Sequence, residues 1–235
     1  MCGCFPTGRH YAGIAHLLRA VTRGLVEGHS AEAPWADLPI ILVDVETTGK
    51  DASSDRVVEV GFAVARGGEI TERRNWLVNP GRPIPQEASD IHKITDDDVK
   101  DAPAFEAIAA EVAAAIEGAI PGAYNAAFDK AFLTNELARA GLSLRRDIEW
   151  IDPLVWAREL QQGERSRALG EVAARLGISL ENAHRAADDA EAALRVLLAL
   201  GRDVRVPRTY GALVQEQRRL ALAQADERRL RWRQG

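Results

Sequence analysis

The segment LVDVETTGK, residues 42–50, constrains this chain more than any other, because an apolar run ends there in two carboxylates, Asp44 and Glu46, placed two residues apart. Residues i and i+2 of a strand point to the same face, so both acids would lie on one side at the strand's C-terminal end. Two buried like charges repel, and one takes up a proton unless a cation lies between them. A hard divalent cation such as Mg²⁺ or Mn²⁺ would resolve the conflict, since it prefers carboxylate oxygens. From this segment alone, an exposed strand end with two acids in a turn is an equally good interpretation.

The composition is that of a globular protein with one sizeable core, since 46% of the 235 residues are hydrophobic. No apolar run reaches the ~20 residues that cross a bilayer, and charged residues interrupt the N-terminal apolar segment, so we expect a soluble, cytoplasmic protein without membrane contact. Cys2 and Cys4 lie too close together for a stabilising disulfide and are interpreted as free thiols.

The net charge of −5 is unevenly distributed, because residues 202–235 hold nine Arg against four acids. A basic end beside an acidic body fits a nucleic-acid enzyme whose catalytic carboxylates need cations. It fits an ordinary solvated amphipathic helix equally well.

The hydrophobic pattern predicts a mixed α/β sheet covered by helices. Three consecutive strands are expected at 40–46, 56–65 and 69–78, the last two forming an antiparallel pair joined at Gly67-Gly68. Asp152 followed by Pro153 predicts a helix start, because Asp caps a helix and Pro suits its first turn. The other expected elements are short strands at 122–125 and 149–151, and helices at about 11–26, 105–117, 127–140, 166–176, 185–200 and 209–232.

Two connecting segments stand out between these elements. Residues 79–99 are dense in Pro and Gly, which indicates an ordered surface loop of the kind that often carries function. Residues 28–39 are interpreted as a linker. Trp76, Trp150 and Trp156 fall within apolar elements, so we expect them in the core.

Two further segments hold residues that could complete a cation site. YNAAFDKAFL places Asp129 near a helix start, where an acid could also be a capping residue and nothing more. AHRAADDAEAAL places His184 at a helix entry and Asp189 five positions later, although a lone His is more often structural. Asp188 and Asp189 could be a solvated pair, but one residue on a helix is about 100° of rotation, so they cannot share a role.

Three motifs follow one another along the chain: Asp-x-Glu-Thr-Thr-Gly, then Asn-x-x-Phe-Asp, then His followed five positions later by Asp. In this order they resemble the motifs of the DEDDh 3'-5' exonucleases. This is the superfamily of the proofreading epsilon subunit of bacterial DNA polymerase III, RNase T and oligoribonuclease. The resemblance covers about residues 38–202, so we expect an exonuclease domain between an N-terminal helical extension and linker (1–37) and a basic helical C-terminal tail (203–235). It implies a ribonuclease H-like fold, in which three antiparallel strands precede parallel ones.

The resemblance also implies the site residues. Two divalent ions, Mg²⁺ or Mn²⁺, would be held by four acids, and His184 would be the general base, since an imidazole of pKa ~6.5 can take a water proton near neutral pH. Two metals ~4 Å apart can generate hydroxide and stabilise the leaving 3'-oxygen of an in-line displacement. The implied ligands are Asp44, Glu46, Asp129 and Asp189, and the implied substrate contacts, in the terminal-nucleotide pocket, are Thr47, His92, Asn125 and Phe128.

The implied activity is a metal-dependent 3'-5' exonuclease that acts on single-stranded DNA or RNA and releases nucleoside 5'-monophosphates. Two alternatives stay open: an oligoribonuclease-like enzyme that degrades very short RNA, and a catalytically silent nucleic-acid-binding module. The complete set of four acids and a His argues against the silent module, because without catalysis nothing would justify an uncompensated carboxylate cluster.

Other features of the chain leave partners and pathway open. Lys93 departs from the family pattern, in which Gly commonly follows the loop His. Relatives occur as dimers and as subunits, so a homodimer and a replisome association are both open, although no clamp-binding or polymerase-binding motif is recognisable. Proofreading, DNA repair and RNA turnover are equally open as pathways.

Overall fold

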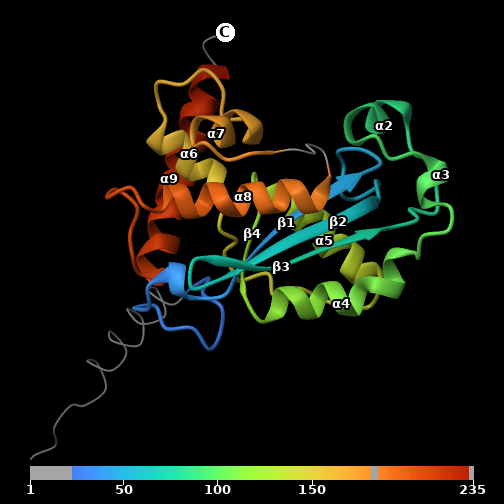
Figure 1. Ribbon diagram of the computed structural model, residues 1–235, viewed down its shortest axis with the longest axis horizontal. Helices are drawn as coiled ribbons and strands as arrows, with labels where there is room; N and C mark the ends of the chain where they lie inside the picture. Colours follow the sequence, from blue (N-terminus) through green and yellow to red (C-terminus); the bar gives the residue numbers. More distant parts are fainter. Residues whose placement is uncertain (1–22, 181–184, 233–235) are drawn as a thin grey trace, which may run out of the picture.

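The computed structural model describes residues 23–180 and 185–232, which form a mixed four-stranded sheet flanked by helices (Figure 1). The strand order is β3-β2-β1-β4. β1 (Ile40–Thr47), β2 (Val57–Arg66) and β3 (Glu69–Leu77) are antiparallel neighbours, while β4 (Ile120–Gly122) runs parallel to β1. The predicted mixed sheet, with antiparallel strands first, is therefore confirmed.

The two short strands differ from the prediction. β4 lies at Ile120–Gly122 instead of 122–125, and the strand expected at 149–151 is reduced to an isolated bridge between Ile151 and Gly122. The chain cannot continue as a strand through Asn125, whose φ of 71° is left-handed. Gly122 is required where the two segments meet, since a Cβ there would lie 2.4 Å from the Ile151 carbonyl oxygen.

The alternation of side chains along β1 divides the core into two layers. Ile41, Val43 and Val45 face a cluster that includes α4 (Phe105–Glu117) and α5 (Ala127–Arg139). Ile40 and Leu42 face the opposite cluster, which includes α8 (Ala186–Leu200). Because Asp44 and Glu46 continue the second series, the period of two carries them to the α8 side of the sheet.

The α8 layer also contains α6 (Pro153–Leu160), α7 (Leu169–Arg175) and α9 (Tyr210–Trp232), which correspond to predicted helices. α6 begins as predicted, because the Asp152 side chain accepts a hydrogen bond from the Leu154 N–H and Pro153 occupies the first turn. Trp150 and Trp156 are buried as expected, whereas Trp76 is partly buried against the Phe62 ring.

The predicted loop at 79–99 is more regular than expected, because it contains two short helices, α2 (Gln86–His92) and α3 (Asp96–Val99). A reciprocal capping box between Thr95 and Asp98 starts α3. Lys93 ends α2 at a φ of 61°, so the position at which relatives commonly have Gly does adopt a left-handed conformation here.

The segment interpreted as a linker is packed against the body of the protein. A single 3-10 turn (η1, Trp35–Asp37) buries Trp35, whose Nε1 donates to the Pro207 carbonyl at 2.8 Å. Of the helix expected at 11–26, residues 11–22 lie outside the described part, and residues 23–26 form a turn followed by irregular chain. The domain boundaries near 37 and 202 stay predictions, although described residues on both sides of each share one core cluster. No described helix is both long and apolar enough to cross a membrane.

Candidate active site

Three carboxylates meet at the C-terminal end of β1. Asp44 and Glu46 come from β1, and Asp189 comes from the first turn of α8. One oxygen of each lies within 4.8 Å of the others, and all three residues are partly buried. Asp188, by contrast, pairs with Arg73 on β3 at 2.6 Å, so the two adjacent acids have different neighbours. The geometry suits a divalent cation, since three carboxylate oxygens converge at a spacing that one ion could bridge.

Asp129 approaches the same strand end from the other layer. It lies in the first turn of α5, is 3% exposed, and its Oδ1 accepts a hydrogen bond from the Val45 N–H at 3.0 Å. Val45 stands between Asp44 and Glu46, so this bond ties Asp129 to the backbone that carries both. Asp129 does not belong to the group of mutually close oxygens, but its charge is one cause of the raised pKa of Asp44.

Three of the four acids, Asp44, Glu46 and Asp129, have raised pKa values. Burial, followed by the charges of Asp129 and Glu46, raises the pKa of Asp44 well above its ordinary value. Burial and then the Asp189 charge raise the pKa of Glu46 to about 8, and burial raises that of Asp129 to about 8. A cation among these groups would stabilise the charged carboxylates that burial and mutual repulsion disfavour, which is the physical reason to expect metal binding here.

The start of α8 is fixed by a buried glutamate that sequence reasoning missed. Glu59 of β2, which is fully buried and pairs in register with Glu46, accepts from the Ala186 N–H at 2.9 Å and from Arg185 Nη2 at 2.6 Å. Asn75 Nδ2 donates to the same carboxylate at 2.9 Å. The only available signal was one charged residue in the middle of the apolar run VVEVGFAVA.

Gly61 lets α8 lie directly on the sheet. A Cβ at this position would lie 2.1 Å from the Ala186 carbonyl carbon and from the Ala187 nitrogen. Gly61 is the cross-strand partner of Asp44, so the close approach occurs beside the carboxylates. Because Gly61 has no side chain, α8 can pack close to the sheet, and the Glu59 carboxylate fixes where the helix begins. Together these two features determine where Asp189 lies relative to Asp44.

An apolar cavity of about 570 Å³ adjoins the acids. Three of the predicted substrate contacts, Thr47, His92 and Phe128, line it together with Glu46 and the exposed Ile91. The buried His92 accepts a hydrogen bond from the Ile94 N–H at its Nδ1, which places the proton of a neutral ring on Nε2. The cavity thus combines aromatic and aliphatic walls with a carboxylate edge.

One predicted site residue lies outside this set, and another lies outside the described residues. Asn125 does not line the cavity; its left-handed backbone turns the chain into α5, and its N–H donates to Asp152. His184 lies outside the described residues, immediately before Arg185.

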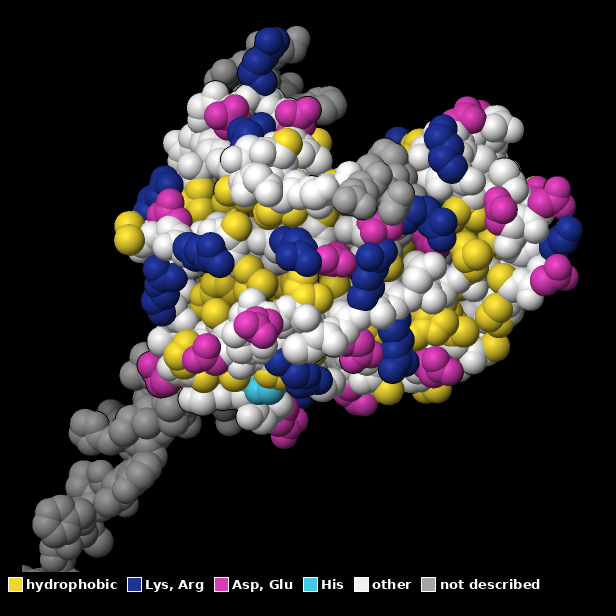
Figure 2. All heavy atoms as spheres, viewed as in Figure 1, with side chains coloured by type: hydrophobic (Ala, Val, Ile, Leu, Met, Phe, Trp, Pro, Cys, Tyr) yellow, Lys and Arg dark blue, Asp and Glu magenta, His cyan; other side chains and the backbone are white. Residues whose placement is uncertain are grey.

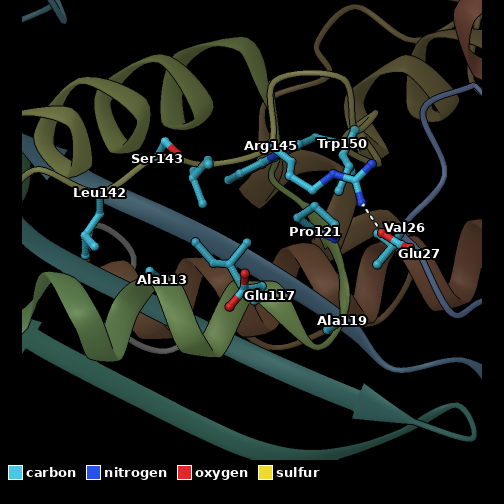
Figure 3. A pocket seen from close by; sticks show the side chains of 13 residues that line it. Val26, Glu27, Ala113, Glu117, Ala119, Pro121, Leu142, Ser143, Arg145 and Trp150 are labelled. Carbon is cyan, nitrogen blue, oxygen red and sulfur yellow. Dashed lines mark hydrogen bonds and ion pairs between the residues drawn. The ribbon is translucent and has the colours of Figure 1, made fainter.

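Another pocket, between α4 and the segment after α5, lies near the N-terminal end of β1 and is spanned by the Arg145–Glu27 ion pair at 3.1 Å (Figure 3). It therefore does not join the acidic site.

Comparison with known proteins agrees with this architecture. The family model described as Exonuclease, of the RNase T type, matches residues 41–197. The chain is 30% identical over 207 residues to the PolC-type DNA polymerase III of Streptococcus suis, which covers 85% of this chain and 14% of that protein. It is 32% identical over 152 residues to the 3'-5' exonuclease DinG of Bacillus subtilis, covering 64% of this chain and 16% of that protein. The chain thus spans only a small part of the length of these curated relatives.

A solved structure shares the fold. Exonuclease X in complex with 5' overhanging duplex DNA superposes with a TM-score of 0.60 and 22% sequence identity, covering 76% of this chain and 99% of that one. The matched family segment runs from β1 to α8 and includes all four carboxylates. This chain therefore belongs to the RNase T family of exonucleases.

Proposed function

We propose that this chain hydrolyses single-stranded DNA or RNA from the 3' end and releases nucleoside 5'-monophosphates, as a DEDDh-type exonuclease. The observation that carries the proposal is the convergence of acids from β1 and α8, with Asp129 of α5 bonded to the same strand, beside an apolar cavity that could receive a terminal nucleoside. DNA is the first substrate to test, since one relative is a DNA polymerase and the structural neighbour is a complex with DNA.

The residues take complementary roles in this proposal. Asp44, Glu46, Asp129 and Asp189 hold two divalent ions, and the fit is supported by their oxygen donors and by the repulsion that a cation would relieve. When bound, such ions supply an activated hydroxide and stabilise charge on the scissile phosphate and the leaving oxygen. His184 accepts the proton of the attacking water, because imidazole titrates near neutral pH.

The cavity orients the substrate. Phe128 and Ile91 offer apolar faces to the terminal base, and Thr47 and His92 offer polar atoms at the cavity wall. Binding the terminal nucleoside there would place the adjacent phosphodiester at the carboxylates, because Glu46 belongs to both the cavity wall and the acid cluster.

The test is the degradation of 5'-labelled DNA and RNA of matched sequence, from dinucleotides to long oligomers, with Mn²⁺, Mg²⁺ or chelator. We expect a metal-dependent ladder that shortens from the 3' end, is abolished by Asp44→Ala, and is slowed by at least ~10²-fold by His184→Ala while metal binding persists. Selective cleavage of the shortest RNA would point to the oligoribonuclease alternative. Tight nucleic-acid binding without any cleavage would replace the enzyme by a binding module.

A further inference from the structure

Several arginines of the C-terminal region are neutralised by nearby acids. Figure 2 shows Lys and Arg side chains interspersed with acidic ones on the face in view, without one continuous basic surface. Within the described part of the region, four arginines form ion pairs with nearby carboxylates: Arg205 with Asp203, Arg218 with Glu149, Arg219 with Glu216 and Arg229 with Asp226. The basic surplus therefore does not by itself mark a binding surface. Arg228 on α9 forms no ion pair with any described residue, and it lines a cavity with other arginines.

Arg228 lines a cavity of about 460 Å³ with two other arginines, Arg158 of α6 and Arg167 of the α6–α7 connection. None of the three forms an ion pair with a described residue, although Glu159 and Glu227 also line the cavity. Burial and then the charge of Arg228 lower the pKa of Arg158, so its strongest charged neighbour is another cation. Three arginines thus line one cavity, and no described carboxylate forms an ion pair with any of them.

Two buried polar atoms also lack partners in residues that line this cavity. Arg167 uses its Nη atoms to hold the connection between α6 and α7, donating to the carbonyls of Gln161, Gln162 and Glu164, but its Nε is buried without a hydrogen bond. Gln224 donates to the Val155 carbonyl at 2.9 Å, and its Oε1 is buried without a partner. Arg167 is therefore held in place by the α6–α7 connection and contributes positive charge to the cavity rather than a free guanidinium edge.

The arginine cavity is connected to the end of the sheet that carries the acids. Tyr124 donates its hydroxyl hydrogen bond to the Arg167 carbonyl at 2.6 Å. Tyr124 follows Gly122 by two residues, and Gly122 pairs with Leu42, which precedes Asp44 by two residues. Since neighbouring strands lie about 4.8 Å apart, the Tyr124 backbone leaves the sheet beside the strand end where the carboxylates gather. One tyrosine side chain therefore separates that edge from the arginine-bearing connection.

We propose that Arg158 and Arg228 bind backbone phosphates of the nucleic-acid strand several nucleotides upstream of the 3' end held at the carboxylates, with Arg167 adding positive charge to the same cavity. The inference rests on the proposed exonuclease function and extends it to substrate length. Planar guanidinium groups match phosphate oxygens bidentately, and phosphate contacts are independent of base sequence. Substrates too short to reach the cavity would gain nothing from it.

Reversing the charge of an exposed arginine on α9 tests whether the cavity contacts phosphate without taking part in catalysis. In the full chain, Arg228→Glu removes a cavity cation, whereas Arg229→Glu, one residue along the same helix, makes the same charge change outside the cavity lining. We expect Arg228→Glu to raise KM about 10-fold for an oligonucleotide of about thirty residues and to leave kcat/KM on dinucleotides unchanged. We expect a second effect on the binding constant K for the long oligonucleotide, measured in an Asp44→Ala background. Arg228→Glu should make the negative slope of log K against log salt concentration shallower by about 0.7, which corresponds to one phosphate contact on a single strand. Arg158→Gln should act in the same direction, and Arg229→Glu should resemble the parent.

Several results would overturn the proposal. Equal losses on dinucleotides and long strands would make Arg228 a structural residue, and an unchanged salt slope or an equal effect of Arg229→Glu would remove the phosphate contact. Failure of the proposed phosphate site can be distinguished from failure of the proposed exonuclease activity. A chain that cleaves nothing but binds long strands with an Arg228-dependent salt slope would keep the phosphate site while the proposed activity falls.

Discussion

Replacing Gly61 by Ala tests whether close packing of α8 on β2 positions the metal ligands. The added Cβ would lie 2.1 Å from two backbone atoms of α8, whereas ordinary contacts begin near 3.4 Å, so the helix start has to retreat by roughly 1.3 Å. Backbone atoms cannot rotate away as a side chain can. Asp189 lies in the first turn of the same helix, so it moves with Ala186 and Ala187 and draws away from Asp44.

The expected magnitude follows from this displacement. A shift of about 1 Å in a reacting group costs about 10²-fold in rate, so we expect kcat to fall by about that factor. Overpacking costs about 1–3 kcal/mol of unfolding free energy, while relief from glycine in a strand returns about 0.5–1 kcal/mol, so the protein should stay folded and be destabilised by about 1–2 kcal/mol. The affinity for Mn²⁺, measured by titration calorimetry, should weaken along with turnover.

Gly118→Ala is the matched control, because a Cβ at Gly118 meets no atom within 4 Å and the residue has a negative φ of −92°. This control should keep parental turnover, Mn²⁺ affinity and stability. Steady-state kinetics on labelled DNA, calorimetry and thermal unfolding of both variants complete the comparison. Parental turnover and Mn²⁺ affinity in Gly61→Ala would refute the reasoning, since the ligand geometry would then not depend on how closely α8 approaches β2.

Two further predictions concern charge. Glu59→Gln should weaken Mn²⁺ binding about 10-fold and cost about 2 kcal/mol of unfolding free energy, because it releases Arg185 from the start of α8. The control is Glu136→Gln, since Glu136 is equally buried and paired with Arg56; this variant should lose similar stability but keep its Mn²⁺ affinity. Equal losses of Mn²⁺ affinity in the two variants would contradict a positioning role for Glu59. Secondly, the pKa of Glu46 rises from 4.5 to about 8 on folding. A raised carboxyl pKa means that the folded state binds more protons than the unfolded state, so without metal the melting temperature should fall as the pH rises from about 5 to about 8. Mn²⁺ should stabilise the fold increasingly over that window, and a melting temperature in chelator that rises with pH there would contradict the assignment.

The sequence predicted those parts of the fold that local patterns determine. Period-two alternation located β1 to β3 within a residue or two, and the Asp152-Pro153 pair located the start of α6. The same period placed Asp44 and Glu46 on one face, and helical rotation separated Asp189 from Asp188, which the structure pairs with Arg73. Each of these features depends on residues that are close in the chain.

Contacts between distant residues were not predictable in this way. The supposed linker is held by Trp35 and Pro207, 172 positions apart, and α8 is anchored by Glu59 and Arg185, 126 positions apart. β4 is only three residues long, and its position depends on pairing with β1 and on the bridge to Ile151 rather than on an apolar run of its own. A short strand defined by its neighbours leaves little signal in its own residues.

The acids are positioned by anchors that do not require a cation. Asp129 is tied to the backbone of β1 through Val45, and Asp189 is carried by a helix fixed to β2 through Glu59. Both anchors engage the two central strands, so repulsion between the carboxylates cannot spread them apart without breaking sheet or helix contacts. Burial raises the pKa of Glu46 and of Asp129 to about 8, and repulsion from Asp189 adds to the rise at Glu46. A divalent cation would displace protons from these carboxyl groups without moving the ligands, and its affinity should therefore depend on how firmly Glu59 and Gly61 hold α8 as much as on the acids themselves.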